Sequence, residues 1–325
     1  MSIEFLLKNA SLANYPSQSR VHRLASFDTP NCSCYVKRDD ELGFGISGSK
    51  IRKYLSLLPY LLSQKIEEAV VIGSPFSNHV LSICQLLKEN KIDPVLYLMG
   101  EKPVKKLGNF HLLSLLIEEE KMHFLPRNAW ARSPEIAIEH VRMSEQEGKK
   151  SFYLPMGAAC KEALTGMLTL PLDILRNEQE NAITFDHVFV DAGTGMMAAC
   201  LILAFSFLQR TTTVHVVQMA EDKSCFEDIL QLWKKELQEL LNAPILSPVH
   251  YHVYPPHSAR SFGSVNKSIF KTIEEVARAE GFFLDPIYTA KLMQTGKKVL
   301  TEKPIMGKAL FIHSGGGLSL LGFQH

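Results

Sequence analysis

Apolar runs of strand length alternate with amphipathic segments of helical period along most of the chain. The amphipathic segments include residues 78–89 and 134–148. Continuous apolar strands joined by helices are typical of parallel sheets that are covered by helices on both faces. The pattern therefore predicts a doubly wound α/β fold, and the two series of strands indicate two sheets. The predicted strands are residues 69–73, 94–99, 121–126, 151–155, 187–193, 213–219, 251–255 and 309–316.

The length and composition of the chain fit a folded protein with two domains. It has 325 residues, 46% of them hydrophobic, and a net charge of +1. This length exceeds that of a typical single domain, so we expect two domains or one domain with a large insertion. A nucleic-acid partner would require clustered excess Lys and Arg, which the balanced charge does not indicate.

The N-terminal segment and the apolar runs favour a cytoplasmic location. The first apolar stretch is too short for the core of a signal peptide, and the acidic Glu4 precedes it. No apolar run approaches the length that spans a bilayer. We therefore expect a cytoplasmic protein with a small-molecule substrate and no membrane or nucleic-acid partner.

The six cysteines do not predict a disulfide framework in a chain of this length. Cys32 and Cys34 are two residues apart, so on a strand both side chains point to the same face. A metal site would need further Cys or His ligands at paired spacing, and the sequence shows none. We expect buried structural thiols and no bound metal.

Ligands in folds of this type bind where loops leave the carboxyl ends of the strands. Lys50 directly follows Gly48 and Ser49, in a loop of small residues at the start of a predicted helix. One interpretation is that Lys50, Arg52 and Lys53 form a basic, solvated surface. The other is that Lys50 holds a cofactor as a Schiff base, which requires a close approach of the cofactor ring and a partly deprotonated amine.

Ser77, Asn78 and His79 open the helix that follows the strand at 69–73. A Ser or Asn at this place can simply cap the helix. Exposed amides and hydroxyls at a helix N terminus also suit a substrate carboxylate. Both interpretations remain open for this segment.

Gly193, Thr194 and Gly195 link the strand at 187–193 to an apolar helix, so that backbone amides can converge on a phosphate. Gly193, Gly195 and Ala198 also match the G-x-G-x-x-G/A dinucleotide fingerprint, with Glu221 just past the next strand. The spacing to Glu221 is somewhat longer than the usual ~20 residues. A nicotinamide-dependent oxidoreductase is therefore a competing hypothesis for this loop.

Two further segments carry candidate residues near the C terminus. Tyr288 and Thr289 stand at the start of a predicted helix, where a tyrosine often serves only for packing. His313 and Ser314 end the last predicted strand, and three glycines then lead into a final helix. Consecutive glycines allow a tight turn or a close approach of the backbone. His313 alone is typical of a structural histidine.

Taken in order, these motifs resemble those of the 1-aminocyclopropane-1-carboxylate (ACC) deaminase and D-cysteine desulfhydrase family. They are KRDD…SGSKIRKY, SNH, GTG, DPIYTAK and HSGG, and they extend from about Tyr35 to Leu321. The resemblance implies pyridoxal 5′-phosphate (PLP) as cofactor and the tryptophan-synthase-β type of fold (PLP fold type II). It further implies a homodimer, and a small domain at 55–165 inserted in a large domain formed by 1–54 and 166–325.

The resemblance also implies a role for each matched residue. Lys50 would form the Schiff base and move the proton at the substrate α-carbon, with Tyr288 as acid/base or nucleophile and Ser77 as a further catalytic group. Asn78 would bind the 3′-oxygen of PLP, and Ser314 would face the pyridine nitrogen. The substrate contacts would be Ser77, Asn78, His79 and Thr289. The phosphate would be held by Gly193, Thr194, Gly195, Met196 and Met197.

Several positions differ from the family pattern. The family usually has GGNK where this chain has serines on both sides of Gly48. Gly and Thr usually follow the phosphate-loop motif, whereas Met196 and Met197 stand here. Backbone amides survive that change, but a hydroxyl contact to phosphate is lost. The second active-site tyrosine of the family aligns with Phe262.

The identity of the substrate depends on two positions. ACC deaminases of the family carry Glu after the motif tyrosine and Leu at the position of Ser314, and the desulfhydrases carry hydroxyl residues at both. Thr289 and Ser314 therefore favour D-cysteine desulfhydrase, a PLP-dependent lyase or deaminase. A hydroxyl at Ser314 would leave the pyridine nitrogen largely unprotonated and favour prompt β-elimination. The alternatives are ACC deaminase and a PLP-binding homologue with little catalysis.

Overall fold

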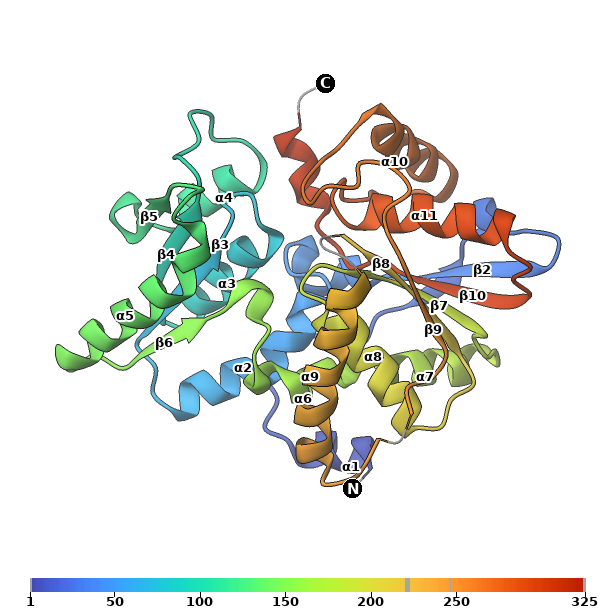
Figure 1. Ribbon diagram of the computed structural model, residues 1–325, viewed down its shortest axis with the longest axis horizontal. Helices are drawn as coiled ribbons and strands as arrows, with labels where there is room; N and C mark the ends of the chain where they lie inside the picture. Colours follow the sequence, from blue (N-terminus) through green and yellow to red (C-terminus); the bar gives the residue numbers. More distant parts are fainter. Residues whose placement is uncertain (1, 220–222, 246, 324–325) are drawn as a thin grey trace.

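The protein forms two lobes, each built around one sheet (Figure 1). The computed structural model describes residues 2–219, 223–245 and 247–323. Within these ranges the larger sheet has six strands in the order β1-β2-β10-β7-β8-β9. β1 pairs antiparallel with β2, and the other pairs are parallel. The strands are β1 (Val21–Arg23), β2 (Cys32–Lys37), β10 (Gly307–Ile312), β7 (His187–Ala192), β8 (Thr213–Gln218) and β9 (Tyr251–Tyr254).

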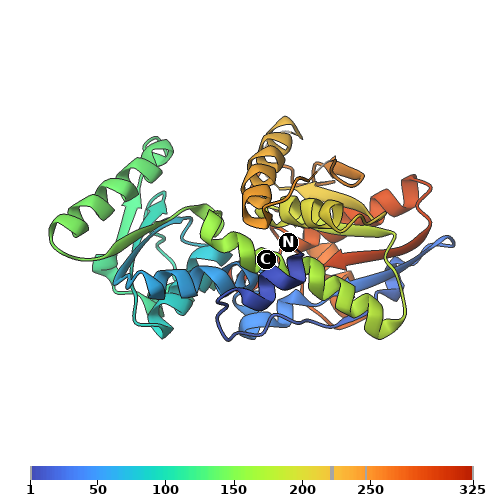
Figure 2. The same cartoon turned by 90° about the horizontal axis from the view of Figure 1, so that it is seen from below.

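The smaller sheet is parallel, with the strand order β5-β4-β3-β6. Its strands are β5 (Met122–Leu125), β4 (Asp93–Met99), β3 (Glu68–Gly73) and β6 (Ser151–Leu154). Every residue of β3 is buried because strands flank it on both sides and helices cover both faces. Figure 2 shows this lobe beside the larger one, with α2 between them.

Helices cover both faces of each sheet. In the larger sheet, Val188 and Val190 of β7 pack into the core that includes α2, α8 and α9. Phe189, on the opposite face, packs into the core that includes α10 and α11. The helices are α1 (Ile3–Asn9), α2 (Lys50–Ser63), α3 (Asn78–Glu89), α4 (Gly108–Leu116), α5 (Ser133–Gln146), α6 (Leu164–Met167), α7 (Thr169–Asn181), α8 (Met196–Phe207), α9 (Lys223–Leu241), α10 (Lys267–Glu280) and α11 (Thr289–Glu302).

The predicted fold is confirmed: the protein is α/β, with two mostly parallel sheets covered by helices. All eight predicted strands are present, although the last one ends at Ile312 and residues 313–316 form a loop. The predicted final helix is a short 3₁₀ segment at Gly317–Gly322. The smaller sheet lies within residues 55–165, and α2 crosses the expected boundary at residue 54. The domain division itself stays a prediction.

The thiols of Cys32 and Cys34 share one buried face of β2, as expected from their spacing. All six cysteines are free. Within the described ranges, no group of three or more His, Cys, Asp or Glu side chains is arranged to hold a metal ion. None of the helices described is long and apolar enough to cross a membrane.

A buried ion-pair network fixes α2 to the larger sheet. Arg52 donates two hydrogen bonds of 2.7 Å to Asp39 and one of 2.8 Å to Asp173 on α7. Lys37, at the end of β2, donates a 2.5 Å hydrogen bond to the same carboxylate of Asp173. The side chains of Arg52 and Lys37 have no exposed surface, and Lys53 is also buried. The interpretation of this part of α2 as a solvated basic surface is therefore wrong.

Candidate active site

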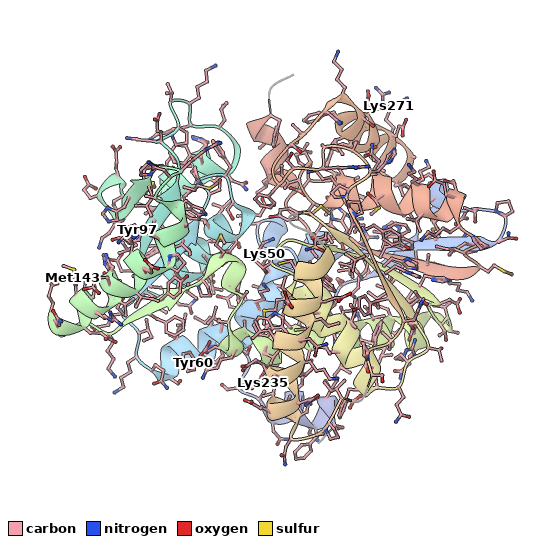
Figure 3. The ribbon with its side chains drawn as sticks, viewed as in Figure 1. Lys50, Tyr60, Tyr97, Met143, Lys235 and Lys271 are labelled. Atoms are coloured by element: carbon pink, nitrogen blue, oxygen red, sulfur yellow. The ribbon has the colours of Figure 1, made fainter. Side chains whose placement is uncertain are left out.

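The two sheets bring four loops together at the carboxyl ends of their strands. In the smaller sheet β3 lies between β4 and β6, and in the larger sheet β7 lies between β8 and β10. The chain therefore continues from β3 to β4 and from β7 to β8 on one side, whereas the neighbour on the other side, β6 or β10, comes later in the sequence. Such switch points open a crevice for ligands. Figure 3 shows Lys50 between the two lobes, at this junction.

Close packing between glycines and their neighbours confirms that these loops meet. A Cβ placed on Gly157, after β6, would lie 2.8 Å from the Thr194 methyl group, after β7. A Cβ on Gly316, after β10, would overlap the side-chain amide of Asn78, after β3. The turn at Asp285–Tyr288 joins the two pairs of loops, because Tyr288 packs on Gly193 and Asp285 lies next to Asn78, so the candidate residues belong to one site.

Lys50 is the first residue of α2, and the loop before it is fixed against the end of β10. The backbone N–H of Ser49 donates a 3.0 Å hydrogen bond to the carbonyl of Ser314, and the Ser49 hydroxyl donates another of 3.2 Å. Gly48 has φ +54° and packs directly against Ser314 and Gly315, so that a Cβ there would overlap the Ser314 carbonyl oxygen. The small residues seen in the sequence thus allow two backbones to touch.

The amine of Lys50 lies in a desolvated setting beside an aromatic ring. Its Nζ is 5.7 Å from the centre of the Tyr288 ring. Burial lowers the pKa of Lys50, and the nearby Asp191 and Asp285 act in the opposite direction. A lowered pKa increases the neutral fraction of the amine, which is the form that attacks a carbonyl or accepts a proton.

Asp285 organises the start of α11 and places Tyr288. Its Oδ1 accepts hydrogen bonds from the backbone N–H groups of Tyr288 (2.6 Å) and Thr289 (3.0 Å). The ring of Tyr288 packs so closely on Gly193 that a Cβ there would lie 3.0 Å from Cε1. Burial, together with Asp285 and Asp191, raises the pKa of Tyr288. The phenol therefore remains protonated at neutral pH and can act as a proton donor.

Thr289 is fully buried, and its hydroxyl is engaged within the same turn. Its Oγ1 accepts a 2.7 Å hydrogen bond from the backbone N–H of Asp285. The geometry gives Thr289 a local role in holding Asp285 and, through it, Tyr288. Its predicted contact with substrate stays a prediction.

The Ser77–His79 segment begins α3, and the capping interpretation of Ser77 is confirmed. Its Oγ accepts hydrogen bonds from the backbone N–H groups of His79 (3.1 Å) and Val80 (3.4 Å). Asn78 is held by its neighbours: its Oδ1 accepts a 2.6 Å bond from Asn109, and its Nδ2 lies 3.4 Å from an oxygen of Asp285. This arrangement connects α3 directly to α11, and the proposed substrate contacts of the segment stay predictions.

His79 is a buried, neutral imidazole, and one of its two ring nitrogens has no hydrogen-bond partner among the described residues. Its Nδ1 lies 3.1 Å from the Tyr54 hydroxyl, and its Nε2 is buried without a hydrogen-bond partner among the described residues. Burial, together with Lys53 and Lys50, lowers the pKa of His79 well below its usual value. An unpaired polar atom of this kind is unusual in a protein interior and is suited to a polar ligand atom.

The predicted phosphate loop has the form of an anion site at a helix N terminus. Gly195 adopts a left-handed conformation (φ +77°) directly before α8, whose first backbone N–H groups have no partners within the helix. The side chain of Met196 is fully buried in the core, and Met197 is partly buried against it. The polar groups offered here are therefore the backbone amides and the Thr194 hydroxyl.

Sequence reasoning missed Lys53, which supplies a positive charge beside this loop. Its Nζ donates a 2.6 Å hydrogen bond to the carbonyl of Gly157, the residue that packs on Thr194. Burial and Lys50 lower the pKa of Lys53 to about 8, so that it is mostly charged at neutral pH. The available signal was its spacing, because residues three apart on a helix share one face.

Sequence reasoning also missed Asp191, at the end of β7. Asp191 is buried, and its Oδ1 has no hydrogen-bond partner in the described part of the chain. Burial raises the pKa of Asp191 to about 6, while the Ser314 hydroxyl and Lys50 act in the opposite direction. The signal was a lone charge inside an otherwise apolar strand.

His313 and Phe262 take the places that the sequence indicated. Nε2 of His313 donates to the carbonyl of Phe283 at 2.9 Å, and its Nδ1 accepts a 3.3 Å bond from Gly315, so that it is a satisfied structural histidine. The ring of Phe262 packs edge-on to Tyr288, with centroids 6.2 Å apart. A ring without a hydroxyl therefore stands next to the candidate acid.

These residues fit a phosphorylated aldehyde cofactor. The site has a desolvated lysine for a covalent bond, and a helix N terminus with Lys53 for a phosphate. It also has two unpaired buried polar atoms, in His79 and Asp191, for further contacts. No single loop supplies the lysine, the phosphate site and the unpaired polar atoms together.

Comparisons with known proteins identify the family. The family model described as pyridoxal-phosphate dependent enzyme matches residues 14–315. The chain belongs to this family. A Pyrococcus abyssi protein, provisionally named 1-aminocyclopropane-1-carboxylate deaminase, is 30% identical over 87% of this chain and 84% of its own length.

Two other similar proteins agree with this assignment. The bifunctional D-cysteine desulfhydrase/1-aminocyclopropane-1-carboxylate deaminase of Arabidopsis thaliana is 24% identical over 95% of this chain and 78% of that protein. The crystal structure of an ACC deaminase homologue superposes with a TM-score of 0.86 and 25% identity, covering 99% of this chain and 96% of the other.

Membership of this family settles the cofactor and the class of chemistry. The protein is a PLP-dependent lyase of the ACC deaminase and D-cysteine desulfhydrase family. The comparisons support a lyase, and classification as a hydrolase is wrong. The family match also rules against the nicotinamide hypothesis, whose acidic residue, Glu221, lies outside the described residues.

Proposed function

We propose that the protein is a D-cysteine desulfhydrase that converts D-cysteine to pyruvate, sulfide and ammonia, and that it acts as a cytoplasmic homodimer. The observation that carries the proposal is the desolvated amine of Lys50, with its lowered pKa, 5.7 Å from the ring of Tyr288. This pair offers a base for the α-proton and an acid for the leaving group, which are the two proton transfers of a β-elimination.

The residues that would hold the cofactor come from both lobes. Lys50 would bind it covalently, and Asn78 would contact its 3′-oxygen. The backbone amides from Gly193 to Met197 would hold the phosphate, with Lys53 as its counter-charge. Ser314 would face the ring nitrogen. When bound, PLP supplies the electron sink that makes the α-hydrogen of an amino acid acidic.

The chain's own residues would then perform the elimination. The start of α3 would bind the substrate carboxylate through backbone amides, because a helix N terminus attracts anions. The amine of Lys50, once free, would take the proton from the α-carbon. Tyr288 would donate its phenolic proton as the bond between the β-carbon and sulfur breaks, so that sulfide leaves as a protonated species. Hydrolysis of the remaining enamine gives pyruvate and ammonia.

D-cysteine suits these residues better than ACC does. ACC has no α-hydrogen, so its ring must be opened by a nucleophile or by removal of a β-proton, which requires additional acid/base groups. The ring adjacent to Tyr288 is that of Phe262, which offers no hydroxyl. The hydroxyl residues Thr289 and Ser314 match the desulfhydrase pattern rather than the deaminase pattern.

Parallel assays of both substrates test the proposal. We expect sulfide and pyruvate from D-cysteine, with β-chloro-D-alanine as a second substrate, and little or no 2-oxobutanoate from ACC. L-cysteine serves as the control for configuration at the α-carbon. Faster turnover of ACC would establish the deaminase alternative. No turnover of either substrate by protein that holds PLP would favour a cofactor-binding homologue with little catalysis.

A further inference from the structure

Asp191 follows Val190 near the end of β7, Ser314 follows the neighbouring strand β10, and the Ser314 hydroxyl interacts with the Asp191 carboxylate. β7 and β10 pair in parallel, with Phe189 opposite Phe311. In this register Asp191 is level with His313, one residue before Ser314. Side chains alternate along a strand, so Asp191 points to the same face of the sheet as Phe189. That face is the one covered by α11, which begins at the Asp285–Tyr288 turn.

The carboxyl group of Asp191 has an oxygen without a partner. Asp191 is 6% exposed, and its Oδ1 receives no hydrogen bond from any residue that the structure describes. Four residues from three parts of the fold interact with it: Lys50 of α2, Ser314 after β10, and Asp285 and Tyr288 at the start of α11. Buried carboxylates in proteins are almost always paired, so the carboxylate of Asp191 can accept a hydrogen bond from a neighbouring donor such as the Ser314 hydroxyl.

The Ser314 hydroxyl can have two opposite effects on a ring nitrogen. A hydroxyl has one proton to donate and two lone pairs to accept with. If it donates to the nitrogen, it stabilises the unprotonated ring. If the hydroxyl already donates its hydrogen bond to a carboxylate, it can only accept one from the ring, and it then stabilises the protonated nitrogen. The partner of the hydroxyl therefore decides which form of the ring is favoured.

We propose that Asp191 is a positioning residue that accepts a hydrogen bond from the Ser314 hydroxyl and thereby keeps the ring nitrogen of PLP protonated. The inference rests on the proposed function only in placing Ser314 opposite that nitrogen. It reverses the expectation drawn from Ser314 alone, which did not include a carboxylate next to the hydroxyl. A protonated ring withdraws electrons more strongly and so makes a better electron sink.

Nitrogen NMR of the holoenzyme tests the proposal without substrate or turnover. Protein loaded with PLP that carries ¹⁵N in the ring is compared with Asp191→Asn, Ser314→Ala and the double variant. We expect the wild-type ring nitrogen to resonate at the protonated position. In Asp191→Asn it should move to the unprotonated position, and Ser314→Ala should produce the same shift. In the double variant the shift should be no larger than in Ser314→Ala, because Asp191 acts through the hydroxyl.

Asp186→Asn provides the matched control. Asp186 precedes the opposite end of β7, where its carboxylate accepts a 2.8 Å hydrogen bond from the backbone of Lys308. This variant removes a charge next to the same strand and should leave the ring resonance unchanged. If Asp191→Asn does not retain the cofactor, Asp191→Ala takes its place, since it also removes the carboxylate and leaves the Ser314 hydroxyl intact.

Two results would overturn the inference, and neither depends on the substrate. One is a wild-type ring nitrogen at the unprotonated position. The other is an unchanged resonance in Asp191→Asn that has retained the cofactor, whatever Ser314→Ala shows. Failure of the proposed function would appear differently, as a protonated ring in a holoenzyme that does not release sulfide from D-cysteine.

Discussion

Replacing Gly48 with Ala should damage the site without altering any functional side chain. Gly48 adopts φ +54° and is packed against the backbone of the loop that follows β10. A methyl group there would overlap the carbonyl oxygen of Ser314 and lie 3.0 Å from the Cα of Gly315. Both neighbours are backbone atoms, so no side chain can rotate away. The loop that leads into Lys50 must move instead.

The magnitude follows from two separate costs. A non-glycine residue in the left-handed region costs about 1–2 kcal/mol. Forcing an extra methyl group into close-packed surroundings adds about 1–3 kcal/mol. We therefore expect Gly48→Ala to lower the free energy of unfolding by about 2–5 kcal/mol. Because Lys50 is two residues away, the displaced loop should also reduce the fraction of protein that binds PLP.

Urea unfolding and the absorbance of bound cofactor measure the two effects. Gly148→Ala is the matched control, since Gly148 also has a positive φ (+85°) but a Cβ there would meet no atom within 4 Å. This control should lose only about 1–2 kcal/mol and should load PLP normally. Equal losses in the two variants, or full loading of Gly48→Ala, would show that the contact with Ser314 does not determine the position of Lys50.

Four further predictions concern the lysines, the tyrosine and the buried ion pairs. Lys50→Ala should fold normally but lose the borohydride-reducible PLP adduct, and mass mapping of that adduct to another lysine would refute its role. Tyr288→Phe should lower kcat by ~10²-fold or more with cofactor affinity nearly unchanged, as for loss of a positioned acid/base. Lys53→Met should weaken PLP binding, measured by equilibrium dialysis, while a pyridoxal control lacking the phosphate should bind both proteins equally. The positive charges of Arg52 and Lys37 outweigh burial and lower the pKa of Asp39 and Asp173 below 3.8. The ion pairs therefore stabilise the fold fully above this pH, and their contribution is lost as the pH falls further. Urea unfolding should show the free energy of unfolding declining over this range, and in Asp39→Asn it should decline less steeply with pH.

Features set by local sequence were predictable. The eight strands follow from continuous apolar runs, and the Ser77 cap follows from a hydroxyl residue at the start of a helix. Lys50 stood out because it directly follows Gly48 and Ser49, in a loop with little side-chain bulk. Each of these properties depends on residues within a few positions of one another.

Features that arise between distant segments were not predictable. Arg52 and Lys53 read as surface residues because their acidic and carbonyl partners lie far along the chain, at Asp173 and Gly157. Asp191 gains its importance only where β10 pairs with β7 and brings Ser314 beside it. The short edge strand β1 has too few residues to form a pattern at all.

The position of β10 determines when the protein can become functional during its synthesis. Its two neighbours, β2 and β7, are made long before it, and β10 is then inserted between them rather than added at an edge. Until residues 307–312 leave the ribosome, the larger sheet exists as two halves with unpaired inner edges, which are the kind of surface that aggregates and recruits chaperones. The segment that closes the sheet also carries Ser314, whose carbonyl fixes the loop before Lys50. Placement of Lys50 is therefore tied to completion of the sheet, and a nascent chain that has not folded this far lacks the contact that fixes the loop before this lysine.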